Sequence, residues 1–182
     1  MKSEIYRDLY NFEMEQRGHL IDAANIPIVA ITVLGGGLIT MVMGFPYSAG
    51  AIQLGFVISS GTAAAALIVA IWGVFRSFIG YEYERPASPH VWQKHYEGLE
   101  KHYASKVNAA ARADTEFERA FNARLADATD TNRANNRRRG NALALANISG
   151  AIALAALAFA GIFYVVATHG EKPPIHEIRI VS

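Results

Sequence analysis

The sequence predicts an all-α integral membrane protein with three transmembrane helices, an N-terminal amphipathic helix and a long cytoplasmic helix. Three uncharged, apolar segments of about 20, 25 and 28 residues carry this prediction, at residues 26–45, 51–75 and 141–168. About 20 apolar residues suffice to cross a bilayer as a helix, which satisfies its backbone hydrogen bonds internally. The charged region between the last two segments has the length and spacing of the cytoplasmic helix.

The distribution of lysine and arginine predicts the orientation. Of the 17 basic residues, three precede the first apolar segment, none lies in the connection 45–50, twelve lie in residues 76–139 and two follow the third segment. Segments rich in lysine and arginine stay in the cytoplasm. We therefore expect the N-terminus and residues 76–139 in the cytoplasm. The turn at 45–50 and a tail at 169–182 are then expected to be external.

Residues 1–25 are predicted as an amphipathic helix, because Ile5, Leu9 and Phe12 recur at helical spacing. This helix lies either along the inner membrane face or against the long cytoplasmic helix. Residues 26–80 follow as a transmembrane hairpin. Small residues let helices approach closely in lipid, and three glycines in the first span fit this role: Gly35, Gly36 and Gly37.

Residues 81–140 are predicted as a single long cytoplasmic helix after the break at RPASPH, because large or apolar residues recur there every three or four positions. The helix is expected to be continuous, or nearly so, with the third span. Its N-terminal partner covers less than half its length, so we expect a homo-oligomer of roughly four or more chains. Three small residues of the third span fit helix packing: Ala142, Ala146 and Gly150.

No arrangement of residues typical of an enzyme is present. The chain has no cysteine, and it lacks a glycine-rich phosphate loop, a paired acid dyad and a Ser–His–Asp set. His95 and His102 would lie about 10 Å apart along a helix, too far to share one metal ion. We therefore expect no catalytic residue, no metal and no cofactor.

The apolar segments contain no charged residue, which disfavours ion-coupled transport. Their neutral polar residues are candidates for lining a pore or for hydrogen bonds between helices: Gln53, Ser59, Ser60, Thr62, Asn147 and Ser149. Asn147 is the most informative of them, because an amide inside an apolar helix needs a partner.

The stretch TNRANNRRRG at residues 131–140 directly precedes the third span and allows two interpretations. Arg137, Arg138 and Arg139 can extend toward lipid phosphates and mark the inner membrane boundary. Arginine also binds phosphate through two parallel hydrogen bonds, and asparagine can read a base edge. The candidate residues for an anionic ligand are Asn132, Arg133, Asn136 and Arg137.

The hairpin, the Asn/Arg-rich cytoplasmic helix with its NRANNRRR run and the further span resemble small bacterial membrane effectors of nucleotide- or oligonucleotide-signalling anti-phage defence systems, the SLATT-like proteins among them. The resemblance implies an oligomeric effector of the bacterial inner membrane that changes permeability when a signal binds its cytoplasmic part. We therefore expect a gated ion channel or membrane-perturbing assembly that senses a nucleotide or short oligonucleotide. The alternatives are a non-conducting anchor or scaffold that recruits a signalling partner protein, and an accessory subunit of a larger complex.

Overall fold

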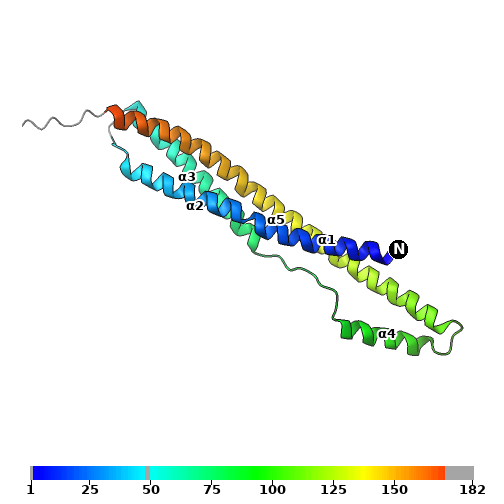
Figure 1. Cartoon of the computed structure of the whole chain (residues 1–182). Helices are drawn as coiled ribbons and strands as arrows, with labels where there is room; N and C mark the ends of the chain where they lie inside the picture. Colours follow the sequence, from blue (N-terminus) through cyan, green and yellow to red (C-terminus); the bar gives the residue numbers. More distant parts are fainter. Residues whose placement is uncertain (1, 48–49, 171–182) are drawn as a thin grey trace, which may run out of the picture. The chain divides into compact units, whose positions relative to one another are not determined.

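The computed structural model describes residues 2–47 and 50–170, and within these ranges the chain forms helices and no strand. The five helices (Figure 1) are α1 (Lys2–Ala23), α2 (Asn25–Gly44), α3 (Ala51–Phe78), α4 (Pro89–Tyr103) and α5 (Ala109–Gly170). The predicted all-α class is confirmed. The predicted external tail lies, from residue 171 onward, outside the described residues.

Three regions of the described chain are helical, long and apolar enough to cross a membrane. They are α2, α3 and the C-terminal part of α5, in which windows of 18 residues reach a mean hydropathy of 2.2, 2.1 and 2.3. These helices coincide with the three apolar segments of the sequence. A turn at Ala24 separates α1 from α2, so the amphipathic and the apolar helix are distinct elements.

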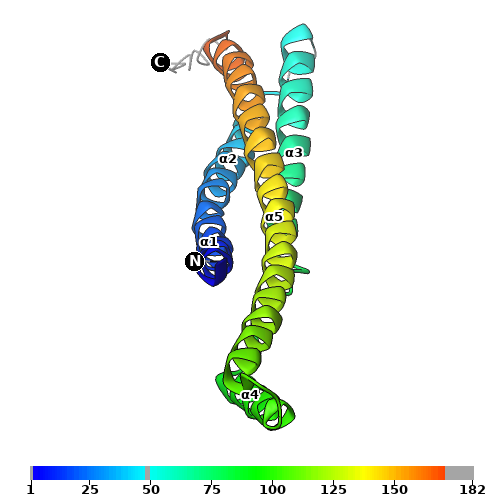
Figure 2. The same ribbon diagram turned by 90° about the vertical axis from the view of Figure 1, so that its right-hand side faces the viewer.

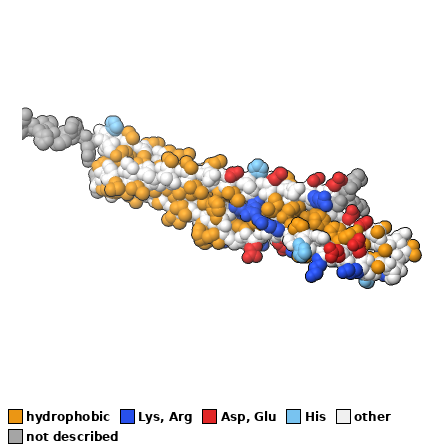
Figure 3. Space-filling model, turned by 60° about the horizontal axis from the view of Figure 1, so that its bottom comes forward, with side chains coloured by type: hydrophobic (Ala, Val, Ile, Leu, Met, Phe, Trp, Pro, Cys, Tyr) orange, Lys and Arg blue, Asp and Glu red, His pale blue; other side chains and the backbone are white. Residues whose placement is uncertain are grey.

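The chain divides into two compact units, which we call the polar unit and the apolar unit. The polar unit combines Met1–Ala24 with Arg76–Ala142, and the apolar unit combines Asn25–Phe75 with the chain from Leu143 onward. Figure 3 shows charged side chains concentrated on one part of the surface, while hydrophobic and uncharged side chains cover another part. Each unit is described by itself below.

The predicted break at RPASPH is confirmed, because residues 79–88 are not helical and α4 begins at Pro89. The prediction of a single helix after this break is wrong, because the chain turns again between α4 and α5. Asn108 lies in this second turn with a φ of 60°, in the left-handed region that asparagine tolerates better than most residues. Its carbonyl oxygen accepts the backbone N–H of Arg112 at 3.0 Å, within the first turn of α5. The heptad-like spacing continues through this segment, but the local turn chemistry interrupts the helix.

The turn allows α4 to fold back on α5 within the polar unit. The ring of Trp92 lies 5.7 Å from that of Phe117 and 5.1 Å from that of Phe121, both in edge-to-face geometry. Aromatic pairs in this geometry stabilise beyond their buried area. An amphipathic helix that folds back in this way covers its apolar face with its own chain.

The N-terminal helix α1 also packs on α5, which is the second of the two alternatives expected for it. The Arg7 guanidinium lies 5.6 Å from the centre of the Phe121 ring, and Glu13 is almost completely buried. Together, α1 and α4 cover much of the polar half of α5. The length of this helix therefore does not by itself require a second copy of the chain.

Helix α5 continues from the polar residues into the third apolar segment without interruption, as the sequence predicts (Figure 2). It contains 62 residues, which correspond to a length of about 93 Å at 1.5 Å per residue. Gly140, at the border between the two compositions, is helical like its neighbours. One continuous helix thus contains both the Asn/Arg run and the third apolar segment.

The apolar unit packs α2, α3 and α5 around small residues. Its buried residues form two clusters, one of Leu38, Ala63, Leu67, Ala153 and Ala156 and one of Phe45, Phe56 and Ala160. The Phe45 and Phe56 rings stack with centroids 3.9 Å apart. Alanines on α3 and α5 bring these helices close enough for such contacts.

The closest approaches in the apolar unit occur at other glycines than the three predicted. A Cβ atom on Gly55 would lie 2.6 Å from the Phe163 ring, and one on Gly44 would lie 2.8 Å from the Tyr164 hydroxyl. By contrast, a Cβ atom on Gly35 or Gly36 would meet no atom within 4 Å, and one on Gly37 would make ordinary contact with Leu157. Sequence position in the middle of a span therefore did not identify the contact glycines.

Candidate functional site

The Asn/Arg run of α5, at residues 131–140, binds the non-helical segment between α3 and α4. We call this segment, residues 79–88, the connector. Four of its side chains lie at positions i, i+3, i+4 and i+7, on one face of the helix. We call this set, which is buried, the asparagine clamp: Asn132, Asn135, Asn136 and Arg139. The clamp and its binding partners all belong to the polar unit.

Asn132 is fully buried and pairs with both backbone groups of Glu84. Its Oδ1 accepts the Glu84 N–H at 2.9 Å, and its Nδ2 donates to the Glu84 carbonyl oxygen at 3.0 Å. Asn135 Nδ2 donates to the carbonyl oxygen of Glu82 at 2.6 Å. The two amides thus satisfy backbone groups that the non-helical connector cannot satisfy by itself.

Asn136 joins the connector to α1. Its Nδ2 donates to the Glu13 carbonyl oxygen at 2.7 Å and to Glu13 Oε2 at 2.9 Å, while its Oδ1 accepts the Tyr83 hydroxyl at 2.6 Å. The other carboxylate oxygen of Glu13 lies 3.3 Å from Nε of Arg133. A buried carboxylate is stable only when it is paired and hydrogen-bonded, and these contacts supply both conditions.

Arg139 was predicted to extend toward lipid phosphates, but its side chain instead binds the last turn of α3. Its Nε donates to the Ser77 carbonyl oxygen at 2.8 Å, its Nη1 donates to the Tyr83 hydroxyl at 3.3 Å, and its side chain is buried. The final carbonyl groups of a helix have no partner within the helix, and a cation is favourable at this end. Arg137 and Arg138 are exposed and keep the anchoring role as a prediction.

The structure separates the four predicted ligand-binding residues into two pairs. Asn132 and Asn136 are buried and their amides are bonded within the chain, whereas Arg133 and Arg137 are exposed. The exposed fraction of the Arg133 side chain is 66% despite its contact with Glu13. In this conformation, only the two arginines are accessible to an anionic ligand.

Sequence reasoning missed Glu13, Tyr83, Glu84, Asn135 and Arg139 as members of this site. The available signal was the spacing of asparagine and arginine at i, i+3, i+4 and i+7, which places them on one face. That face could not be recognised as inward because the connector that it binds is distant in sequence.

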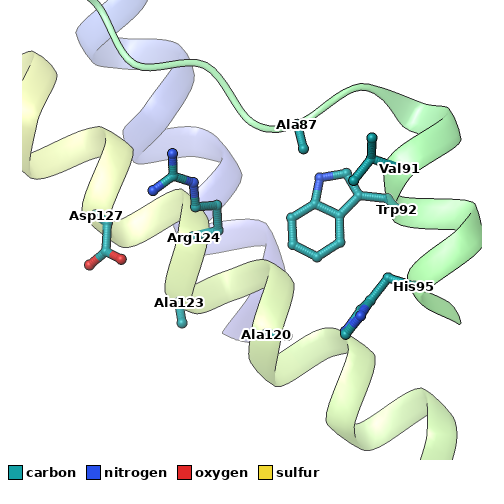
Figure 4. Close-up of a pocket in the computed structure, with 8 residues that line it drawn as sticks. All are labelled: Ala87, Val91, Trp92, His95, Ala120, Ala123, Arg124 and Asp127. Carbon is teal, nitrogen blue, oxygen red and sulfur yellow. The ribbon is translucent and has the colours of Figure 1, made fainter. Parts of the chain in front are cut away.

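A second feature of the polar unit is a cavity of about 450 Å³ between α4, the connector and α5 (Figure 4). It is lined by Ala87, Val91, Trp92, His95, Ala120, Ala123, Arg124 and Asp127. The Trp92 indole N–H is buried and has no hydrogen-bond partner among the described residues. Arg124 lies 3.3 Å from Glu84, and Asp127 shares the rim, so the cavity has no excess of positive charge.

Tyr96 and Asp114 connect α4 to the beginning of α5. The Tyr96 hydroxyl donates to Asp114 Oδ1 at 2.7 Å. This hydrogen bond to a carboxylate raises the pKa of Tyr96 above its ordinary value of 10.0, because ionisation would remove the donated proton and place two negative charges together.

The six polar residues predicted to line a pore or bridge helices do not share one face. Ser60 and Ser149 are buried within the apolar unit, Gln53 and Ser59 are half-buried, and Thr62 and Asn147 are exposed. The three small residues predicted on the third span also divide: Ala146 is fully buried by the chain's own atoms, while Ala142 and Gly150 are half-buried.

The fold and these sites define an all-helical protein with three helices able to cross a membrane and a polar unit held together by buried asparagines. Comparison of the chain with protein-family models, with curated proteins and with solved structures finds no match.

Proposed function

We propose that the chain is an oligomeric effector of the bacterial inner membrane that forms a gated ion pore or a membrane-perturbing assembly. In this proposal, α2, α3 and the C-terminal part of α5 cross the bilayer. The polar unit lies in the cytoplasm, because lysine and arginine are concentrated there. Its ligand is an anionic nucleotide or short oligonucleotide, as the resemblance to anti-phage effectors implies.

The observation that carries the proposal is the continuity of α5. One uninterrupted helix contains the clamp residues and the third apolar segment. The clamp also binds the end of the second apolar helix, through the hydrogen bond from Arg139 to the Ser77 carbonyl oxygen. A change at the clamp would therefore reach two candidate spans through rigid helices, which is the coupling that a ligand-gated assembly needs.

The ligand would bind first at Arg133 and Arg137, the exposed basic residues of the run. A phosphate competes with the Glu13 carboxylate for the Arg133 guanidinium, since arginine binds both groups in the same planar geometry. Loss of this ion pair would weaken the hold of α5 on α1. A ligand that also took the amides of Asn132 and Asn136 would have to break their bonds to the connector, so binding and opening of the clamp are linked.

The test is ion flux through proteoliposomes that contain the purified chain, with ATP, a cyclic dinucleotide or an adenylate trimer added on the side of the polar unit. We expect at least one probe to change the flux, and we expect the Arg133→Ala/Arg137→Ala variant to lose that response. The Arg112→Ala/Arg119→Ala variant removes the same charge from exposed positions of the same helix and should respond like the wild type. Absence of flux from verified oligomers under every condition would refute the pore.

A non-conducting scaffold is the second candidate, and the open cavity beside Trp92 favours it. Apolar walls and a buried N–H without a partner are features of surfaces that a partner protein covers. The scaffold predicts a monomer or dimer in mild detergent and no flux. The mass of the assembly in nanodiscs therefore separates the two candidates.

A further inference from the structure

Five hydroxyl groups of the apolar unit differ from Asn147 in their hydrogen bonding. The hydroxyls of Thr32, Thr40, Ser60, Thr62 and Thr168 each donate to a backbone carbonyl oxygen four residues earlier in their own helix. The side chain of Asn147, by contrast, is exposed on α5 and makes no hydrogen bond with any residue that the structure describes. An amide has two N–H donors and one carbonyl acceptor, which the helix backbone cannot satisfy together.

Asn147 is the seventh residue of the third apolar segment, which the proposed function places in the membrane. It follows Arg139, the last basic residue before the segment, by eight positions; this corresponds to about 12 Å along the helix. Lysine and arginine have long side chains that extend toward the membrane surface, whereas the asparagine side chain is short. Gln53 differs, because it is the third residue of α3, next to the connection between the first two spans.

Asn147 faces away from the chain's own helices. The face of α5 that packs inside the apolar unit contains Ala146, Ser149 and Ala153, all buried. Positions four and eight residues after Asn147 place Ala151 and Ala155 on the outward face with it. The outward face contains small, exposed residues beside the larger Leu154, and we call the small residues together with the amide the Asn147 seam: Ala144, Asn147, Ala151, Ala155 and Ala158.

We propose that the Asn147 seam binds the same seam of a second copy of this chain, with the Asn147 amides of the two copies hydrogen-bonded to each other. A second copy fits best because an amide is self-complementary: the N–H group of one asparagine donates to the carbonyl oxygen of the other. The exposed alanines allow the helix backbones to approach closely enough for that contact. This inference deepens the proposed oligomeric assembly and rests on its placement of α5 in the membrane.

Disulfide crosslinking tests the seam directly, since the chain contains no cysteine of its own. Single cysteines at Ala144, Ala151 and Ala155 should crosslink two copies in native membranes. Leu145, Ile152 and Phe159 are also exposed, but they lie on another side of the same helix, so cysteines at these positions should not crosslink. Crosslinking that is equal on both sides, or that favours the second set, would overturn the proposal.

Substitution of the amide gives an independent measurement. Asn147→Leu should raise the dissociation constant of the assembly in mild detergent about tenfold, because an interhelical amide bond contributes roughly this factor. Asn147→Gln should retain association, and Thr62→Val should not change it, since the Thr62 hydroxyl already bonds its own helix. An Asn147→Leu variant that associates like the wild type would contradict the seam.

The outcomes separate this inference from the proposed function. Crosslinking along the seam without ion flux would support the contact between copies and reject the pore. Flux from assemblies that do not crosslink along the seam would support the pore and reject this contact.

Discussion

The polar unit connects its elements through buried asparagines, whereas the apolar unit connects its helices through alanine and glycine. In the polar unit, the amides of Asn132, Asn135 and Asn136 bind the backbone of the connector or of α1. In the apolar unit, five hydroxyls bond their own helices, and contacts between helices are made by packing at residues such as Ala153 and Gly55. Both units contain asparagine in α5, but among the described residues only the asparagine side chains of the polar unit form hydrogen bonds with other segments of the chain.

The difference follows from the solvent that each unit would meet. Water competes for every hydrogen bond at a polar surface, so a non-helical connector becomes ordered only where buried side chains replace that water. In lipid, no water competes, each helix satisfies its own backbone, and close packing is the remaining force between helices. An exposed amide such as that of Asn147 is therefore unusual in an apolar unit. The buried, hydrogen-bonded amide of Asn132 is ordinary in a polar unit.

The largest effect is expected for Asn132→Ala, which removes the pairing with Glu84 and leaves two backbone groups without partners. The loss should cost about 3 kcal/mol, because each orphaned group costs about 1–3 kcal/mol. Hydrogen exchange of the Glu84 amide in the full-length chain should accelerate by about two orders of magnitude. Asn141→Ala, an exposed asparagine of the same helix, should leave the exchange unchanged. Equal exchange in both variants would show that the clamp does not hold the connector.

A smaller effect is expected in the apolar unit for Gly55→Ala. The added Cβ atom would lie 2.6 Å from the Phe163 ring, so the ring or the helix must move. Overpacking of this kind costs about 1–3 kcal/mol, which thermal unfolding in one detergent should detect. The matched control is Gly61→Ala in the same helix, where a Cβ atom meets nothing within 4 Å. Similar unfolding temperatures for the two variants would contradict the close packing of α3 on α5.

The smallest effect concerns Tyr96, whose pKa is raised mainly by its hydrogen bond to the Asp114 carboxylate. A raised pKa means that the contact contributes its full stability below pH 10 and loses it as the pH rises through the higher value. The Asp114→Asn variant should lower the pKa of Tyr96 toward its ordinary value. Tyrosinate absorbance, compared with that of Tyr96→Phe to isolate this residue, measures the change. An unchanged titration in Asp114→Asn would show that the contact is absent in solution.

Much of the helical architecture could be predicted from the sequence, because it depends on local composition. Long uncharged segments indicate the apolar helices, and the absence of proline between Pro89 and the third apolar segment indicates that α5 is continuous past Gly140. The turn around Asn108 was missed because apolar periodicity continues through it, although an asparagine three positions after Ser105 is compatible with a turn.

The clamp could be located in the sequence but not interpreted from it. The run at residues 131–140 indicated a site, and the accessible pair Arg133 and Arg137 remains a prediction for ligand binding. The partners of Asn132 and Asn136 lie 48 to 123 residues away in the chain, and no local pattern relates them.

The sequence by itself therefore determined the three apolar helices, the apolar or polar character of each region and the continuity of α5 into the third apolar segment, since each depends on neighbouring residues. Only the tertiary structure decided which faces of those helices point inward. It placed Asn132, Asn136 and Arg139 against the connector and α1, and it left Asn147 on an outward face. The physical reason is that burial of a side chain depends on contacts between segments distant in sequence, and asparagine has the same local signal whether it binds its own chain or faces outward.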